Sequence, residues 1–162
     1  MLLDVHKLTV TNGIVPRGVI HIGAHEGREI STYQAMGMQN ILFVEANPFV
    51  YERLRANVGA YSNVKTANCA ITNQDGTVEL HITSMDQSSS ILPLKRHLEI
   101  YPTIQDQVQI PVAAKRLDTL LHEMNVQPSD YNLINIDIQG AELLAFQGAP
   151  LTLQYIEAIN TE

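Results

Sequence analysis

Cysteine is nearly absent from this chain: Cys69 is the only one among 162 residues. No internal disulfide can form, and a zinc site built on cysteines is excluded. The sequence also lacks an uninterrupted apolar run of roughly 18 residues, the length that a bilayer-spanning helix needs. Its first ten residues, MLLDVHKLTV, carry charges and lack the long apolar core of a signal peptide. We therefore expect a cytoplasmic protein with no membrane partner.

Basic residues are scarce as well. The chain has 10 lysines and arginines against 17 aspartates and glutamates, and its formal net charge is −7. The basic residues form no cluster, so nothing offsets the repulsion between an acidic protein and a phosphate backbone. This balance argues against a nucleic acid as partner.

Short apolar runs alternate with segments of helical periodicity, and no internal repeat or flexible linker separates them. This alternation predicts an α/β fold in which helices flank a mostly parallel sheet. We expect residues 1–162 to form one domain, with residues 1–17 as an N-terminal lead-in. Parallel strands are expected at residues 18–22, 41–45, 64–71, 133–138 and 155–160, and helices between Gly27 and Gly37 and at residues 48–58, 117–124 and 141–146.

The segment between the third and fourth of these strands has a different pattern. NQDG predicts a turn, and TVELHIT alternates apolar and polar residues as a half-buried antiparallel strand does. Residues 94–101 are expected to form a short helix. Residues 108–112 are expected to form an edge strand that Pro111 interrupts.

The chain stops at the end of the fifth parallel strand, where an apolar sheet edge would be exposed. We expect the fold to be truncated there, without its last strands, or the edge to be covered by a partner chain, as in a homodimer.

Two features predict a binding site at the carboxyl ends of the strands. The turn after the first strand reads GAHEG, and its Gly23 and Gly27 permit a tight turn and a close approach to a ligand. Glu45 ends the second strand, where a carboxylate can accept two hydrogen bonds from a ribose diol. In this strand–turn–helix–strand order, the two features predict a site for an adenosine-type cofactor.

The choice of cofactor follows from what the turn lacks. It has no middle glycine of the G-x-G-x-x-G fingerprint, which admits a pyrophosphate. The turn therefore favours S-adenosylmethionine, which has no phosphate, without excluding NAD. A purely structural interpretation also stays open, in which the glycines only make the turn and Glu45 is a solvated strand end.

The sequence resembles the FkbM family of methyltransferases over residues 18–162. The segments that carry the resemblance occur in the family's order and spacing: VIHIGAHEG, FVEANP, NQDGTVELHIT, RLDTLL and NLINIDIQGAELLAFQGA. The resemblance implies a Rossmann-like class I methyltransferase fold. It also implies S-adenosylmethionine-dependent transfer of a methyl group to a hydroxyl oxygen of a sugar or other glycan, a polyketide or another small molecule.

The resemblance implies site residues by position. The acid at the end of the fourth strand, facing the methyl donor or the substrate, is Asp137. The residues implied to bind the cofactor are Gly23, Ala24, His25, Gly27, Glu45, Ala46, Asn47 and Ala70. The chain departs from the family at four positions: it has His21, His25, Asn135 and Gln139, where the family commonly has Asp, Asn, Lys and Glu.

Asp137 is also the candidate general base, because a hydroxyl acceptor benefits from a group that takes its proton. It could instead bind the substrate or the ammonium of the cofactor. His21 and His25 straddle a strand end and a turn, so we expect no metal site there, and His21 is expected to be a satisfied core histidine. Glu142 is expected to complement the dipole of its helix. Residues 88–90 are expected to form a polar loop, or else to line the acceptor pocket.

Methyl transfer is the leading hypothesis, and two others stay open. One is a nucleotide-dependent enzyme on a similar sheet. The other is an inactive fragment of the fold that serves as a binding or dimerisation module.

Overall fold

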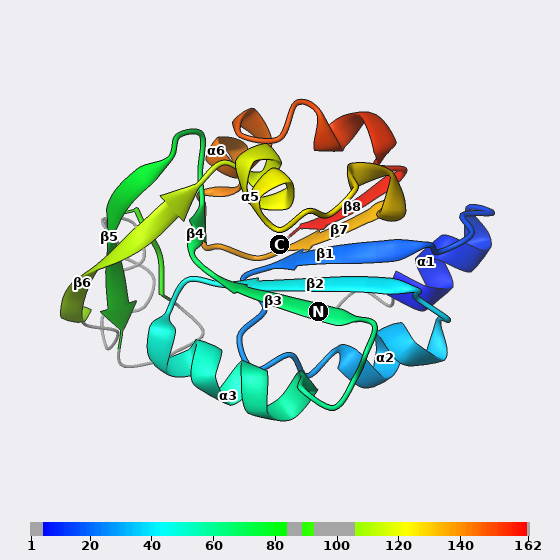
Figure 1. Cartoon of the computed structure of the whole chain (residues 1–162), viewed down its shortest axis with the longest axis horizontal. Helices are drawn as coiled ribbons and strands as arrows, with labels where there is room; N and C mark the ends of the chain where they lie inside the picture. The colour runs from blue at the N-terminus through cyan, green and yellow to red at the C-terminus, as the bar shows by residue number, and fades with distance from the viewer. Residues whose placement is uncertain (1–4, 84–88, 93–105, 162) are drawn as a thin grey trace.

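The computed structural model describes residues 5–83, 89–92 and 106–161, so the helix expected at residues 94–101 lies outside the described residues. Five parallel strands form the main sheet in the order β3-β2-β1-β7-β8 (Figure 1). Their bounds are β1 (Gly18–Ile22), β2 (Asn40–Glu45), β3 (Val64–Asn68), β7 (Leu133–Ile136) and β8 (Ala158–Thr161). The expected α/β fold with a mostly parallel sheet is confirmed.

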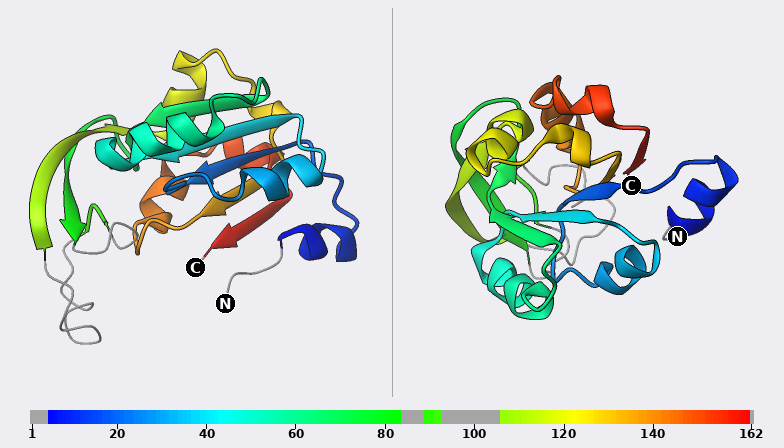
Figure 2. Two further views of the ribbon diagram at one scale, coloured as in Figure 1. Left: turned by 90° about the horizontal axis from the view of Figure 1, so that it is seen from below. Right: turned by 45° about the vertical axis from the view of Figure 1, so that its right-hand side comes forward.

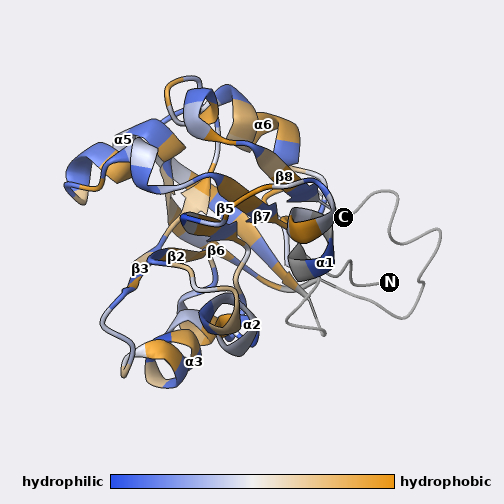
Figure 3. Ribbon diagram, turned by 90° about the vertical axis from the view of Figure 1, so that its right-hand side faces the viewer, coloured by the Kyte–Doolittle hydropathy of each residue, from blue (hydrophilic) through white to orange (hydrophobic). Residues whose placement is uncertain are grey.

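Helices cover both faces of this sheet, as Figure 3 shows. One face carries α2 (Ile30–Ala35) and α3 (Pro48–Val58), and the other carries α5 (Leu117–Glu123) and α6 (Glu142–Gln147). Short 3-10 helices, η2 (Pro128–Asp130) and η3 (Thr152–Tyr155), precede β7 and β8. The N-terminal lead-in contains a further helix, α1 (Val5–Thr11), which lies near the start of β1 (Figures 1 and 2). None of the helices among the described residues has the length and apolar character to cross a bilayer.

The sheet has a separate core on each face because successive side chains of a strand point to opposite sides. On one side the strand residues pack against α2 and α3; this cluster includes Val19, Ile41, Phe43, Leu133, Tyr33, Leu54 and Val58. On the other side they pack against α5 and α6; this cluster includes Ile20, Ile22, Leu42, Val44, Ile134, Ile136, Leu117, Leu120, Leu121 and Ala145. The two cores hold the carboxyl ends of β1, β2 and β7 in one row.

The start of α3 shows how the sequence defines a helix boundary. The side chain of Asn47 accepts a hydrogen bond from the backbone N–H of Phe49 at 3.0 Å, and Pro48 occupies the first helical position. The helix ends at Gly59, as predicted.

A second sheet lies beyond the carboxyl ends of the main strands (Figure 1). It consists of β4 (Ala70–Ile71), β6 (Asp106–Lys115) and β5 (Gly76–Thr83), in that spatial order. The prediction of one strand at residues 64–71 was wrong, because the chain passes from the main sheet to the second sheet at Cys69. The antiparallel pairing of TVELHIT is confirmed, since β5 runs antiparallel to β6.

The prediction that Pro111 lies in an edge strand needs a correction, since β6 is the middle strand of its sheet. Pro111 pairs with Glu79 of β5 on one side. On the other side β4 pairs only with Ala114 and Lys115, beyond the proline. The missing N–H of Pro111 therefore removes no hydrogen bond between β6 and β4.

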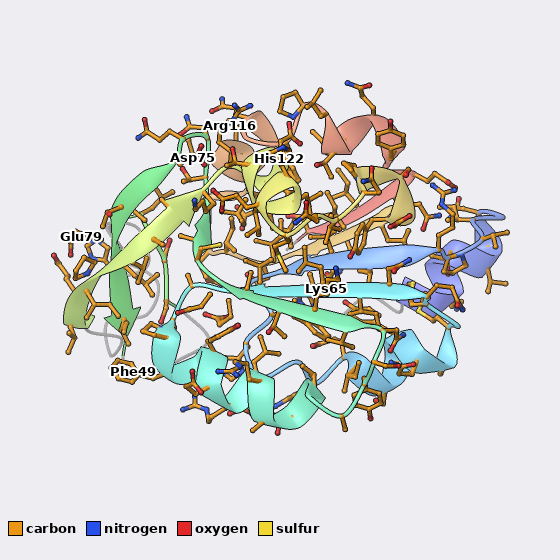
Figure 4. All side chains as sticks on the ribbon, in the orientation of Figure 1. Phe49, Lys65, Asp75, Glu79, Arg116 and His122 are labelled. Atoms are coloured by element: carbon orange, nitrogen blue, oxygen red, sulfur yellow. The ribbon has the colours of Figure 1, made fainter. Side chains whose placement is uncertain are left out.

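Asp75, in the turn before β5, joins the second sheet to α5. Its carboxylate accepts hydrogen bonds from the backbone N–H of Arg116 at 2.8 Å and from the hydroxyl of Thr119 at 3.0 Å. Asp75 and Arg116 lie next to each other at this end of the sheet (Figure 4). The link helps to hold the second sheet over the carboxyl ends of the main strands.

Candidate functional site

A pocket of about 730 Å³ lies at the carboxyl ends of β1, β2 and β7, where the main sheet meets the second one. Its walls are the turn after β1, the end of β2, β4, part of β5 and the turn after β7. Seven of the nine residues predicted to bind a cofactor or to act in catalysis line it: Gly23, Ala24, His25, Glu45, Ala46, Ala70 and Asp137. Their individual roles stay predictions, but the structure brings them together.

Glu45 is the link between the glycine turn and β2. One carboxylate oxygen accepts a hydrogen bond from the backbone N–H of His25 at 2.8 Å, and the other accepts one from the N–H of Asn47 at 2.8 Å. An ionised carboxylate can accept about four hydrogen bonds. Each oxygen therefore keeps capacity for one hydroxyl of a diol.

The environment of Glu45 acts on its pKa in two directions. Burial raises the pKa of this carboxyl above its ordinary value, and the backbone N–H groups of Asn47 and His25 oppose that rise. The carboxylate is buried and accepts hydrogen bonds from two backbone N–H groups. Glu45 is therefore not a solvated residue at a strand end, as the purely structural interpretation had it.

Gly23 is required by the close approach of the turn to β7. Its φ is +79°, and a Cβ at this position would collide with the backbone carbonyl oxygen of Asp137. His25 also has a left-handed backbone, with φ +49°. This conformation turns the backbone N–H of His25 toward Glu45.

Gly27 and Asn47 do not line the pocket among the described residues. A Cβ on Gly27 would lie 2.6 Å from Leu54 and 3.0 Å from Val58, so the glycine allows α3 to pack against the turn. Asn47 begins α3 and donates its N–H to Glu45. The structure thus places both residues behind the pocket wall, where they support Glu45 and the turn.

Asp137 follows β7 and is held by the turn IDIQG. One of its carboxylate oxygens accepts a hydrogen bond from the amide of Gln139 at 2.7 Å. Glu142 accepts hydrogen bonds from the backbone N–H groups of Ile138 at 3.0 Å and Gly140 at 3.2 Å, so it orders this turn in addition to lying at the start of α6. Gln139 has a left-handed φ of +55°.

The wall formed by the second sheet is mostly apolar. Cys69, Ala70, Ile71 and Leu80 line it, and Ala70 and Leu80 belong to one buried cluster. Burial raises the pKa of the Cys69 thiol to about 12, so it is a neutral side chain at ordinary pH. Ser90 also lines the pocket, and its hydroxyl is fixed by the backbone of Gln139 at 3.2 Å.

Four polar side chains of the pocket lining were not predicted as a group from the sequence. We call His21, Tyr33, Asn135 and Asn160 the amide cluster; all four line the pocket. Tyr33 lies 3.1 Å from one ring nitrogen of His21 and 2.9 Å from the amide nitrogen of Asn135. The amide of Asn160 donates to the carbonyl oxygen of Asn135 at 2.7 Å.

Two residues of this cluster could have been noticed in the sequence. His21 and Asn135 are two of the departures from the family pattern, and they are register partners on neighbouring strands. Tyr33 and Asn160 belong to no motif, so only the fold reveals their contact. His21 is a satisfied core histidine, as predicted, because both of its ring nitrogens have hydrogen-bond partners.

The described lining of the pocket carries more acidic than basic side chains. Among the described lining residues, the acids are Glu26, Glu29, Glu45 and Asp137, and the single arginine or lysine is Arg28, which pairs with Glu26 at 3.0 Å. No group of three or more histidine, cysteine or acidic side chains in the described part of the chain is placed to hold a metal ion. The pocket therefore combines the buried carboxylate of Glu45, an apolar wall and an excess of negative charge.

Comparisons with known proteins agree with this geometry. The family model of the methyltransferase FkbM domain matches residues 21–160. The 2-O-methyltransferase NoeI of Sinorhizobium fredii is 30% identical over 169 residues, which cover 99% of this chain and 69% of that protein. The crystal structure of methyltransferase FkbM from Methylobacillus flagellatus matches with a TM-score of 0.60 at 12% identity. This match covers 90% of this chain and 32% of that one, and it shows the likeness of the fold.

Proposed function

Because the chain belongs to the FkbM methyltransferase family, we propose that it transfers a methyl group from S-adenosylmethionine to a hydroxyl oxygen of a sugar or another small molecule. The observation that carries the proposal is the hydrogen bond between the carboxylate of Glu45 and the backbone N–H of His25. It joins the glycine turn and the candidate ribose acid in one pocket. The hydroxyl acceptor is supported by the relative that is a 2-O-methyltransferase.

The charge of the pocket favours this cofactor over NAD. A dinucleotide carries a pyrophosphate, which needs cations or free N–H groups. Arg28 already pairs with Glu26, and Glu45 occupies the N–H of His25. A sulfonium cofactor carries positive charge instead, and the carboxylates around the pocket suit it.

Glu45 would accept hydrogen bonds from the ribose hydroxyls through the free capacity of its two oxygens. The backbone at Gly23 and Ala24 would lie along the middle of the cofactor. Ala70, Ile71 and the rest of the apolar wall would contact the adenine ring.

S-adenosylmethionine supplies a methyl group that is already activated by its sulfonium. The protein must then hold the acceptor in line and take the proton of its hydroxyl. Asp137 would carry out the second task, and its position in the pocket lining after β7 supports this role. The amide of Gln139 donates to Asp137 at 2.7 Å, which orients the carboxylate.

Replacement of Asp137 by Asn tests the catalytic part of the proposal. Transfer of labelled methyl from S-adenosylmethionine would be measured with a panel of neutral methyl glycosides, with benzoate and benzylamine as acceptors of other types. We expect label on a glycoside hydroxyl with the wild type, and a rate about 10²- to 10⁴-fold lower with Asp137→Asn. The affinity for S-adenosylhomocysteine should change by less than about twofold, since the isosteric amide removes only a charge near the methyl donor.

Asp130→Asn, at an exposed position in η2, is the matched control and should keep full activity. An Asp137→Asn protein as active as this control would refute the role of Asp137. Label on benzoate or benzylamine alone would refute the hydroxyl acceptor.

A further inference from the structure

The amide cluster contains a polar atom that lacks a partner. The carbonyl oxygen Oδ1 of Asn160 is buried and has no hydrogen-bond partner, whereas its Nδ2 donates to Asn135. Buried polar atoms are nearly always paired, because leaving one unpaired is energetically costly. Asn160 lies on β8 and lines the same pocket as Glu45. An unpaired acceptor in a pocket wall points to a ligand that donates.

The other hydrogen bonds of the cluster agree with this orientation of the Asn160 amide. The Nδ2 of Asn135 donates to Tyr33 at 2.9 Å and to the Nε2 of His21 at 3.2 Å. His21 then carries its proton on Nδ1 and donates it to Tyr33. The oxygen of Asn135 is thereby left to accept from Asn160, so Asn160 presents its own oxygen as an acceptor.

Charge near this acceptor selects among donors. Glu29 lines the pocket, and its carboxylate lies 3.9 Å from the ring nitrogen Nδ1 of His21, a member of the amide cluster. A carboxylate close to the cluster that holds the unpaired acceptor favours a cationic donor and disfavours an anion. An ammonium group meets both conditions.

The order of the strands indicates which ammonium group of a bound ligand could reach Asn160. Glu45 is on β2, and the next strands along the sheet are β1, β7 and β8. Neighbouring strands are about 4.8 Å apart, so Glu45 and Asn160 lie roughly 14 Å apart across the sheet. A cofactor held by its ribose at Glu45 would direct its amino-acid end along this row.

We infer that Asn160 is the residue that accepts a hydrogen bond from the α-ammonium of the cofactor, and that Tyr33, Asn135 and His21 hold its amide in place. This inference rests on the proposed function, because it requires an adenosyl cofactor with an amino-acid end. It makes β8 part of the cofactor site, together with the turn after β1 and the end of β2. Asn160 would then distinguish the whole cofactor from adenosine derivatives that lack the amino acid.

A comparison of two ligands distinguishes this contact from the other contacts of the cofactor. S-adenosylhomocysteine has the amino-acid end, and 5′-methylthioadenosine has the same adenosyl group without it. Their dissociation constants would be measured by calorimetry for the wild type and for Asn160→Ala. We expect Asn160→Ala to weaken S-adenosylhomocysteine by about tenfold or more and to leave 5′-methylthioadenosine within about twofold.

Asn160→Asp provides the second variant in case the alanine protein fails to fold. It keeps an acceptor oxygen and adds a negative charge, so it should prefer S-adenosylhomocysteine over 5′-methylthioadenosine at least as strongly as the wild type. An unchanged preference in Asn160→Ala, or a lower one in Asn160→Asp, would overturn the inference. Failure of both ligands to bind the wild type would instead overturn the proposed function.

Discussion

His21 carries no charge at any ordinary pH. Burial lowers its pKa to about 3, and its two ring nitrogens are engaged by Tyr33 and Asn135. The family resemblance implies Asp and Lys at positions 21 and 135, which are register partners in β1 and β7. The departures from the family pattern at these two positions therefore belong together. An uncharged, hydrogen-bonded pair stands where the family commonly has two opposite charges.

The buried histidine should make stability depend on pH. An unfolded chain binds a proton at His21 below about pH 6.5, whereas the folded chain does so only near pH 3. Stability from this group is therefore present above pH 6.5 and is lost as the pH falls from 6.5 toward 3, by roughly 1.4 kcal/mol per pH unit. Urea unfolding at pH 7.0, 6.0 and 5.0 would measure the loss.

His21→Asn should lower the overall stability but lose less of it on acidification than the wild type. His122→Asn, at an exposed position on α5 (Figure 4), is the control and should keep the wild-type slope. Equal acid slopes in His21→Asn and the wild type would show that this histidine does not titrate on unfolding.

At the scale of an element, the turn GAHEG serves two purposes: it lines the pocket and it packs against α3. Gly23 allows the turn to approach β7, and His25 supplies an N–H to Glu45 at the pocket. Gly27 faces the other way, toward Leu54 and Val58 of α3. The motif is one stretch of sequence, but its last residue, Gly27, does not line the pocket as the other four residues do.

Gly27→Ala should therefore reduce stability without changing the pocket. The added Cβ meets the side chains of Leu54 and Val58, and the backbone is left-handed with φ +70°. We expect a loss of about 2 kcal/mol or more in the free energy of unfolding. The folded variant should bind S-adenosylhomocysteine with its affinity unchanged within about twofold.

Gly37→Ala is the matched control, since its φ is +73° and nothing lies within 4 Å of the added Cβ. It should cost about 1 kcal/mol, from the backbone alone. Equal losses at the two glycines would contradict the packing role of Gly27, and weaker cofactor binding by Gly27→Ala would place it in the site.

Structural features that depend only on neighbouring residues are predicted well from the sequence. The cap at Asn47 and the glycine turn follow from a few neighbouring residues, so the sequence predicts them closely. The break at Cys69 was missed, because the change of sheet follows from pairing with the distant strand β6. Asn160 was missed for the same reason: its partner Asn135 is 25 positions away and belongs to another strand.

The whole molecule is a layered α/β structure with a second sheet placed across the carboxyl ends of the main strands (Figures 1 and 2). The main sheet supplies the polar contacts of the pocket through Glu45, Asp137 and Asn160, and the second sheet supplies an apolar wall through Ile71 and Leu80. This division matches a ligand with a flat apolar base at one end and charged groups at the other.

The central claim is that this pocket binds an adenosyl cofactor through Glu45, and calorimetry with two ligands tests it most directly. S-adenosylhomocysteine and NAD would each be titrated into the wild type, Glu45→Ala and the control Glu52→Ala, whose side chain is exposed on α3. We expect S-adenosylhomocysteine to bind the wild type and the control equally, Glu45→Ala to weaken this binding by about tenfold or more, and NAD to give no binding heat. Tight NAD binding with no response to S-adenosylhomocysteine, or an unchanged affinity in Glu45→Ala, would contradict it.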